Sequence, residues 1–96
     1  MKYDIDYFIK KFEAIPEEKW HTKHFRNKEG DKFCALGHCN QRLASKHTEE
    51  SQALYSIDER IALINDGKNL FKRIGKTPKE RVINHLKKLK SLDKTE

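Results

Sequence analysis

The stretch that decides the fold is TPKERVINHLKKL, residues 77–89, because it combines a helix start with a helical apolar stripe. Thr77 is a helix-capping residue type, Pro78 suits the first helical position, and Glu80 completes a capping box. The apolar residues recur at the spacing of one helix face: Val82, Ile83, Leu86 and Leu89. The sequence therefore predicts an amphipathic helix that begins after Thr77.

A second amphipathic helix is predicted near the N-terminus, after the capping residue Asp4. Its apolar residues share one face by the same spacing: Ile5, Phe8, Ile9 and Phe12. We expect it to end before Pro16, because helical conformation is disfavoured for the residue before a proline. A short helical turn over residues 16–20 is predicted next, with Trp20 in the core.

Between these helices, residues 34–44 predict a third one with an apolar face that includes Cys39 and Leu43. Gly37 lies inside this helix, where glycine costs roughly 1 kcal/mol relative to alanine. A glycine in that place indicates that another backbone or a bulky ring packs closely against it. Trp20 is the candidate ring.

Two further helices are predicted between residues 48 and 67. Thr48 caps the first, and the capping box of Ser56 and Glu59 opens the second. Gly67 ends the second helix, since glycine suits the left-handed conformation that often follows one. As structure, residues 65–67 are a helix stop; as function, Asp66 is a candidate ligand contact beside the helix of residues 34–44.

The stretch before residue 34 is the least helical. A polar segment with one glycine, NKEGD at residues 27–31, is flanked by Phe25-Arg26 and Lys32-Phe33. Such a pattern is typical of a short hairpin with a loop of three to five residues. The fold class predicted is therefore mainly α: a small helical bundle with a short β-hairpin around residues 24–34.

Length and composition define the class of protein. The chain has 96 residues, of which 35% are apolar and 38% charged, so we predict one domain over residues 1–96 with a frayed end from residue 91 onward. No run approaches the ~18 apolar residues of a membrane span, and the N-terminus lacks the pattern of a secretory signal. We therefore expect a cytoplasmic protein with reduced thiols and no membrane partner.

Four motifs in a fixed order resemble a family of short bacterial and phage proteins. They are Trp20, the CALGHC block at residues 34–39, the INDG segment at residues 64–67, and TPKERV at residues 77–82. The resemblance covers nearly the whole chain. It implies one compact helical domain and a role associated with phages or mobile elements, and it carries no assigned activity.

A cluster of histidines and cysteines raises the question of a metal site, since zinc takes four nitrogen or sulfur ligands. The candidate ligands are His24, Cys34, His38 and Cys39, with His21 as an alternative. Their spacing opposes a site, because Cys34 and Cys39 on a helix point about 140° apart and only Cys34 and His38 share a face. We predict core thiols, no metal and no cofactor.

Cysteine catalysis is the one enzymatic hypothesis that the residues offer. Cys34 is predicted at a helix N-terminus, where free amides and the helix dipole lower a thiol pKa, and His38 follows one turn later. His21 and His24 are alternatives that could approach across the hairpin. The pair Asn65-Asp66 is the candidate source of the orienting third member of a triad, with Asp66 as the residue at stake. Against this, free cysteines are usually buried, and a domain of this size leaves little room for a substrate cleft. We expect no enzymatic activity.

The formal charge is +6, and its local source is a basic segment over residues 68–81 with one acid, Glu80. The candidate phosphate contacts in that segment are Lys68, Lys72, Arg73, Lys76, Lys79 and Arg81. No helix-turn-helix, RNA-binding or zinc-finger signature accompanies them. Nucleic-acid binding is therefore the alternative function, and a solvated helix surface is the simpler interpretation.

The leading hypothesis is a small, non-enzymatic protein-binding or accessory module, such as a regulator or inhibitor in a phage or mobile element. Tyrosine and arginine are favoured at interface hot spots, so Tyr55, Arg60 and Arg73 are the candidate contacts. The identity of the partner, the oligomeric state and any small-molecule ligand stay open at this point.

Overall fold

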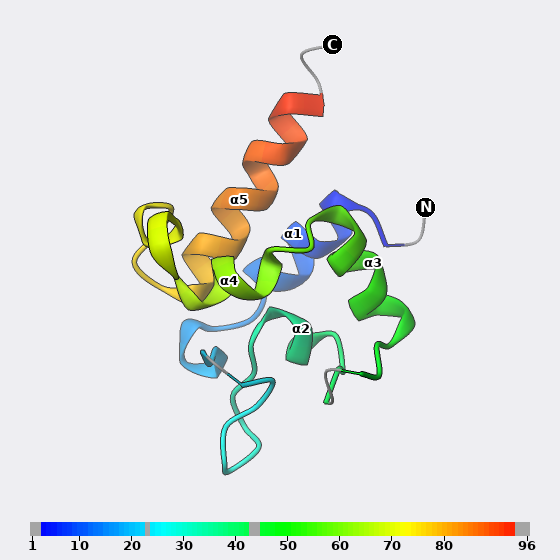
Figure 1. Ribbon diagram of the computed structural model, residues 1–96, viewed down its shortest axis with the longest axis vertical. Helices are drawn as coiled ribbons and strands as arrows, with labels where there is room; N and C mark the ends of the chain where they lie inside the picture. Colours follow the sequence, from blue (N-terminus) through cyan, green and yellow to red (C-terminus); the bar gives the residue numbers. More distant parts are fainter. Residues whose placement is uncertain (1–2, 23, 43–44, 94–96) are drawn as a thin grey trace.

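Helix α5 (Pro78–Asp93) is the longest element of the computed structural model, and it packs against α1 (Ile5–Glu13) and α4 (Ile61–Asp66) (Figure 1). The remaining elements are short: the 3-10 helix η1 (Glu17–Lys19), α2 (Ala35–His38), α3 (Glu49–Ile57) and the 3-10 helix η2 (Asn69–Arg73). The structure describes residues 3–22, 24–42 and 45–93. Within these ranges no β-strand forms, which confirms the predicted mainly α fold.

The core is one apolar cluster to which α1, α4 and α5 all contribute. Phe8 and Phe12 from α1 and Leu86 from α5 have no exposed surface. Trp20 packs on this cluster, with its ring centroid 5.3 Å from that of Phe12, so the prediction of a core tryptophan is confirmed. Side chains of this size stabilise by roughly 1.5–3 kcal/mol each when they are fully buried.

The first and last helices begin where their caps predict. The Asp4 carboxylate accepts a hydrogen bond from the Tyr7 amide at 2.8 Å, and the Thr77 hydroxyl accepts one from the Glu80 amide at 3.1 Å. The Glu80 carboxylate reaches back to the amide of Lys76 at 2.9 Å. These bonds satisfy backbone donors that have no partner within their helix.

The predicted capping box at Ser56 is wrong. Ser56 lies inside α3, where its hydroxyl donates to the carbonyl oxygen of Gln52 at 2.8 Å. The next helix, α4, begins at Ile61, and the side chain that accepts an amide hydrogen bond before it is Asp58, from Arg60 at 2.9 Å. The carboxylate of Asp58 also pairs with His85 of α5. This tertiary contact places the break between the two helices after Ile57, whereas the predicted break lies before Ser56.

Helix α2 is shorter than predicted and its glycine has a different neighbour. It ends at His38, and Asn40 then adopts a φ of 69°, which turns the chain away from helical continuation. A Cβ on Gly37 would lie 2.0 Å from the carbonyl oxygen of Phe25, so the close partner is that backbone and not the expected ring of Trp20. The predicted apolar position Leu43 lies outside the described residues.

Residues 24–34 fold back on themselves without forming the predicted hairpin ladder. The backbone contacts are isolated bridges, one of them between Arg26 and Phe33. The Asn27 side chain explains why, because its oxygen accepts from the amides of Asp31 and Lys32, both at 3.0 Å. A side chain that takes two backbone donors replaces the regular strand pairing.

Helix α5 extends beyond the rest of the body at its C-terminal end (Figure 1), where Leu92 is 55% exposed. The helix continues to Asp93, and residues 94–96 lie outside the described part, so fraying of the chain end stays a prediction. Among the described residues, no helix is long and apolar enough to cross a membrane.

Candidate functional site

A cleft of about 400 Å³ opens between residues 24–26, the start of α2 and helix α4. We call it the Cys34 cleft, and it is lined by His24, Phe25, Arg26, Cys34, Arg42, Ala62 and Asp66. Its volume falls in the range of about 300–1,000 Å³ that is usual for small-molecule sites. The cleft brings together Cys34 and Asp66, which are candidates from the sequence, and adds two arginines that the sequence did not single out.

Asn65 holds the walls of this cleft in place. Its side-chain oxygen accepts from the Ala35 amide at 3.1 Å, and its nitrogen donates to the His21 carbonyl oxygen at 2.9 Å and to the Asp66 carboxylate at 3.1 Å. The side chain is fully buried. Asn65, predicted as part of a helix stop and, with Asp66, as a possible source of a triad member, therefore joins α4 to both segments that surround the cleft.

Cys34 sits at the N-cap of α2, but its thiol is not activated there. Its Sγ accepts a hydrogen bond from the Gly37 amide at 3.4 Å, and the residue is only 6% exposed. Burial raises the pKa of the Cys34 thiol; the Gly37 amide opposes this effect and the Asp66 carboxylate adds to it. The group is therefore a protonated thiol at neutral pH, which is a poor nucleophile.

His38 belongs to a different environment from Cys34. Its Nε2 donates to the carbonyl oxygen of Lys19 at 3.1 Å, and its ring packs edge-on against Trp20 and Phe33. Burial lowers the pKa of His38 to about 4, so the imidazole is neutral. The predicted set of Cys34, His38 and Asp66 is thus divided: two line one cleft, while the histidine donates its Nε2 proton to a backbone oxygen.

The candidate metal ligands are also dispersed. Among the described residues, no group of three or more histidine, cysteine, aspartate or glutamate side chains is placed to hold an ion. His24 lines the Cys34 cleft, and Cys39 is fully buried in the core. Burial, with a contribution from the Glu50 carboxylate, raises the pKa of the Cys39 thiol to about 12.

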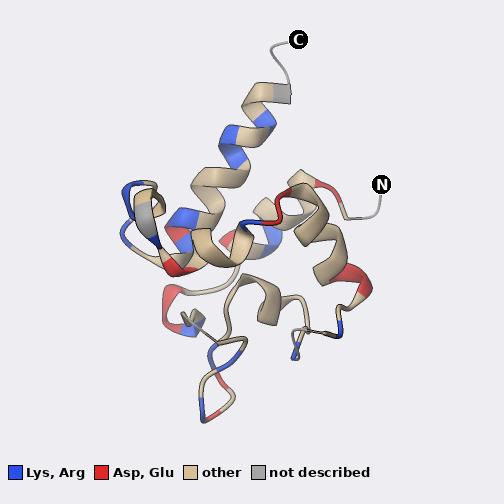
Figure 2. Ribbon diagram, in the orientation of Figure 1, with Lys and Arg blue, Asp and Glu red and all other residues tan. Residues whose placement is uncertain are grey.

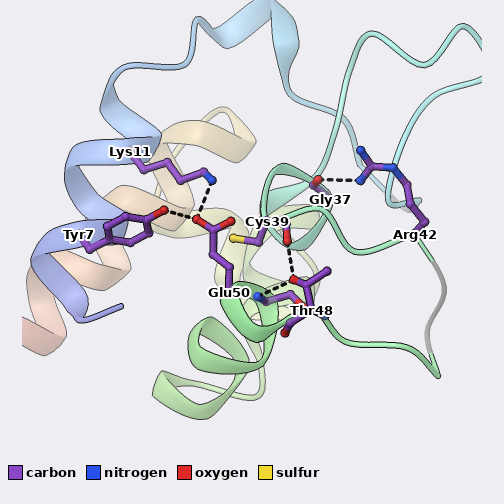
Figure 3. A network of polar contacts seen from close by, with 8 residues as sticks. Tyr7, Lys11, Gly37, Cys39, Arg42, Thr48 and Glu50 are labelled. Carbon is purple, nitrogen blue, oxygen red and sulfur yellow. Dashed lines mark hydrogen bonds and ion pairs between the residues drawn. The ribbon is translucent and has the colours of Figure 1, made fainter. Parts of the chain in front are cut away.

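A polar cluster between α1 and α3 was not predicted from the sequence (Figure 3). The carboxylate of Glu50, which is 8% exposed, accepts hydrogen bonds from the Tyr7 hydroxyl and from Lys11 Nζ, the latter at 2.7 Å. That hydroxyl is a donor here, and its bond to Glu50 together with burial raises the pKa of Tyr7 to about 12. Nearby, the Thr48 hydroxyl donates to the carbonyl oxygen of Cys39 at 2.6 Å. These contacts join the start of α3 to α1 and to the residue that follows α2.

Positive charge is concentrated in the C-terminal third of the chain. Residues 68–90 contain nine lysines and arginines and one acidic residue, a formal charge of +8, so the rest of the chain contributes −2 to the total of +6. Figure 2 shows these basic residues along η2, its flanking loops and α5. The charge is therefore segregated rather than evenly spread.

The exposed side chains described within residues 68–76 make up what we call the basic face: Lys68, Leu70, Lys72, Arg73 and Lys76. All five side chains are exposed, and Leu70 is the most exposed of the large apolar residues at 69%. None of the four cations has an acidic partner within the described ranges 3–22, 24–42 and 45–93.

The other two predicted phosphate contacts lie elsewhere. Arg81 is 7% exposed and donates from Nε to the Ile64 carbonyl oxygen at 3.0 Å, from Nη2 to that of Asn65 at 2.7 Å, and from Nη1 to that of Gly75 at 3.3 Å. It caps the end of α4. Lys79 is half-buried and donates to the Glu13 carbonyl oxygen at 3.1 Å. Both act within the fold.

The candidate interface residues Tyr55 and Arg60 line a shallow hollow together with Asp58. Tyr55 is 37% exposed and its ring lies 5.4 Å from that of His47. Arg60 forms an ion pair with Asp58 at 2.9 Å, and its guanidinium lies 5.7 Å from the ring centroid of Phe71, next to the basic face in the chain. Arg60 is therefore engaged within the molecule, whereas Arg73 is exposed and forms no ion pair with a described residue.

Comparison with known proteins gives no relative: no protein-family model, curated protein or solved structure matches this chain. The resemblance to short bacterial and phage proteins stays a prediction. What the protein does has to be argued from the two surfaces described above, the Cys34 cleft and the basic face.

Proposed function

We propose that this protein is a non-enzymatic docking module that binds the acidic surface of a protein partner through the basic face. One observation carries the proposal: among the described residues, Leu70 is the most exposed large apolar side chain, and the four exposed cations near it in the chain have no acidic partner. An apolar contact surrounded by charge is the usual composition of a protein interface.

The leucine favours a protein over a nucleic acid. A phosphate backbone complements lysine and arginine, and it offers nothing to an exposed leucine outside the grooves. A protein surface can present carboxylates around an apolar pocket, which complements Leu70 and the cations together. Segregated charge of this kind also steers the approach of an acidic partner.

The chemistry of the Cys34 cleft supports the non-enzymatic part of the proposal. The raised thiol pKa of Cys34 makes it a poor nucleophile, and the neutral His38 is bonded to the backbone instead of to that thiol. The proposed setting is the cytoplasm, and a role as a regulator or inhibitor in a phage or mobile element follows from the sequence resemblance alone.

Affinity capture with four variants tests the proposal. Lys72→Glu/Arg73→Glu reverses charge on the basic face, and Leu70→Ser removes its apolar contact. The matched controls are Lys28→Glu/Lys46→Glu, which makes the same change in net charge at other exposed positions, and Leu92→Ser on α5. Each tagged protein is incubated with nuclease-treated extract of its source cells, and captured proteins are quantified by mass spectrometry.

We expect one acidic protein that the wild type and both controls retain and both basic-face variants lose. With that protein purified, Leu70→Ser is expected to weaken binding about tenfold. Capture that is equal for all five proteins, or that only the charge reversal abolishes, contradicts an interface centred on Leu70.

Nucleic-acid binding is the second candidate, favoured by the formal charge of +8 on residues 68–90. Fluorescence anisotropy with labelled duplex DNA and RNA over a salt series tests it. If all four cations of the basic face contact duplex phosphates, the slope of log K against log salt is about −3.6. In that case Lys72→Glu/Arg73→Glu abolishes binding and Leu70→Ser leaves it unchanged.

A further inference from the structure

Two arginines, Arg26 and Arg42, line the Cys34 cleft, and neither has an acidic partner among the described residues. Arginine presents a planar fork of donors that matches a carboxylate. The cleft lies outside the basic face and plays no part in the protein binding proposed above.

Arg42 is held in place before any ligand arrives. Its Nη1 donates to the carbonyl oxygens of Gly37 at 2.9 Å and Gln41 at 3.1 Å, and the guanidinium lies 4.7 Å from the ring centroid of Phe33 (Figure 3 shows the Gly37 contact). Its Nε and Nη2 make no hydrogen bond within the described part of the chain. These donors are therefore available to a ligand and cost little to order.

The rest of the lining sets the character of the ligand. The Phe25 ring, the Ala62 methyl group and the protonated Cys34 thiol supply apolar surface. Asp66 and His24 are the other titratable groups that face the cleft. One carboxylate against two permanent cations leaves an excess of positive charge beside an apolar wall.

We propose that the Cys34 cleft binds a small aromatic carboxylate, with the carboxylate on Arg42 and Arg26 and the ring against Phe25 and Ala62. The recognition is a charge-assisted hydrogen-bonded pair beside an apolar contact, so a neutral amide of the same shape is a poor ligand. A carboxylate without the ring loses the apolar contact and binds more weakly.

An NMR titration of the isotope-labelled protein tests this assignment with benzoate as the probe and benzamide and acetate as matched compounds. We expect benzoate to shift the amide signals of Ala35, Gly37 and Ala62, with a Kd on the order of 1 mM for a fragment of this size. Benzamide and acetate are expected to bind at least about tenfold more weakly.

Variants connect the shifts to the arginines. Arg42→Gln is expected to weaken benzoate binding about tenfold and Arg26→Gln several-fold. Arg26 is exposed, so its variant keeps the test valid if Arg42→Gln disturbs the turn after α2. Arg73→Gln on the basic face is the control and leaves the benzoate Kd unchanged.

The assignment is overturned if benzamide binds as well as benzoate, if both cleft variants keep the wild-type Kd, or if the shifts fall on residues 68–76 instead of the cleft. None of these outcomes bears on protein docking at the basic face, which the capture experiment measures separately.

Discussion

The α1–α5 pair and the segment of residues 20–42 become ordered in different ways. The helices are joined by apolar packing, in which Phe8, Phe12 and Leu86 are fully buried. The described part of residues 20–42 has one short helix; it also reaches the core through Trp20, Leu36 and Cys39, but its course is set by side-chain-to-backbone hydrogen bonds and one close backbone approach at Gly37. Apolar packing tolerates substitution by residues of similar size, whereas a specific polar contact requires one residue type. The ligand binding proposed for the Cys34 cleft therefore depends on the less tolerant of these two regions.

The largest expected effect is in the helical pair. Phe12→Ala removes a fully buried ring from the centre of the core and should cost about 4 kcal/mol of unfolding free energy through lost burial and the cavity left behind. Chemical denaturation monitored by circular dichroism measures it. Phe12→Leu, which keeps most of the volume, is expected to cost less than half as much, and equal costs would contradict packing as the cause.

Asn65 tests the polar contacts of residues 20–42. Asn65→Leu keeps the volume but leaves the Ala35 amide and the His21 carbonyl without their partner, at an expected cost of about 3 kcal/mol. The exposed Asn84, whose side chain donates to the Ile74 carbonyl oxygen at 2.8 Å, is the control, and Asn84→Leu should cost below about 1 kcal/mol. Similar losses of unfolding free energy at both positions would contradict the idea that burial makes the Asn65 hydrogen bonds more important for stability.

Gly37→Ala is expected to cost about 2 kcal/mol, because the new methyl group would lie 2.0 Å from the Phe25 carbonyl oxygen and must push that backbone away. The gain in helix propensity from alanine, about 1 kcal/mol, offsets only part of this. Gly30→Ala is the matched variant: its φ is +77°, but its Cβ would meet only Arg26 Nη1 at an ordinary contact distance of 3.6 Å, so we expect about 1 kcal/mol. A stabilised Gly37→Ala protein would show that the two backbones do not need this close approach.

The smallest effect concerns pH and the contact that links α3 to α5. Burial alone would raise the pKa of Asp58, but hydrogen bonds from the Arg60 side chain and backbone and from His85 outweigh it and lower the pKa to about 2. Since the folded pKa lies below the unfolded value of 3.8, the stabilisation is present above that value and disappears as the pH falls toward 2. Its size is at most about 2 kcal/mol.

Denaturation of wild type and Asp58→Asn at a series of pH values measures this contribution. The difference between their unfolding free energies should be constant near neutral pH and shrink between about pH 4 and pH 2. A difference that stays constant down to the lowest pH would show that Asp58 does not titrate with a depressed pKa.

The comparison also explains how far the sequence could predict the fold. The starts of α1 and α5 were predictable because Asp4 and Thr77 bind amides only three residues away. The end of α3 was not, because Asp58 is drawn to His85, which is 27 residues distant. Ser56 had the correct local pattern, and a tertiary contact prevailed over it.

In the candidate site, too, residue types could be predicted from the sequence, whereas contacts between distant residues could not. Cys34 and Asp66 were visible as reactive residue types, and the structure does place both at one cleft. The roles of Arg26 and Arg42 depend on turns set by Asn27 and by the positive φ of Asn40, which no periodicity reveals. The basic segment was clear from composition, but the burial of Arg81 was not, since its acceptors are backbone carbonyls 16 and 17 residues away.

Arg81 has a consequence for how the basic face meets a partner. By bonding the carbonyls of Ile64 and Asn65 at one end and of Gly75 at the other, a single guanidinium closes the loop that carries the exposed cations. The conformational entropy of that loop is thus given up when the protein folds. A partner that binds Leu70 and its neighbours does not have to supply that ordering, so more of the contact energy appears as affinity.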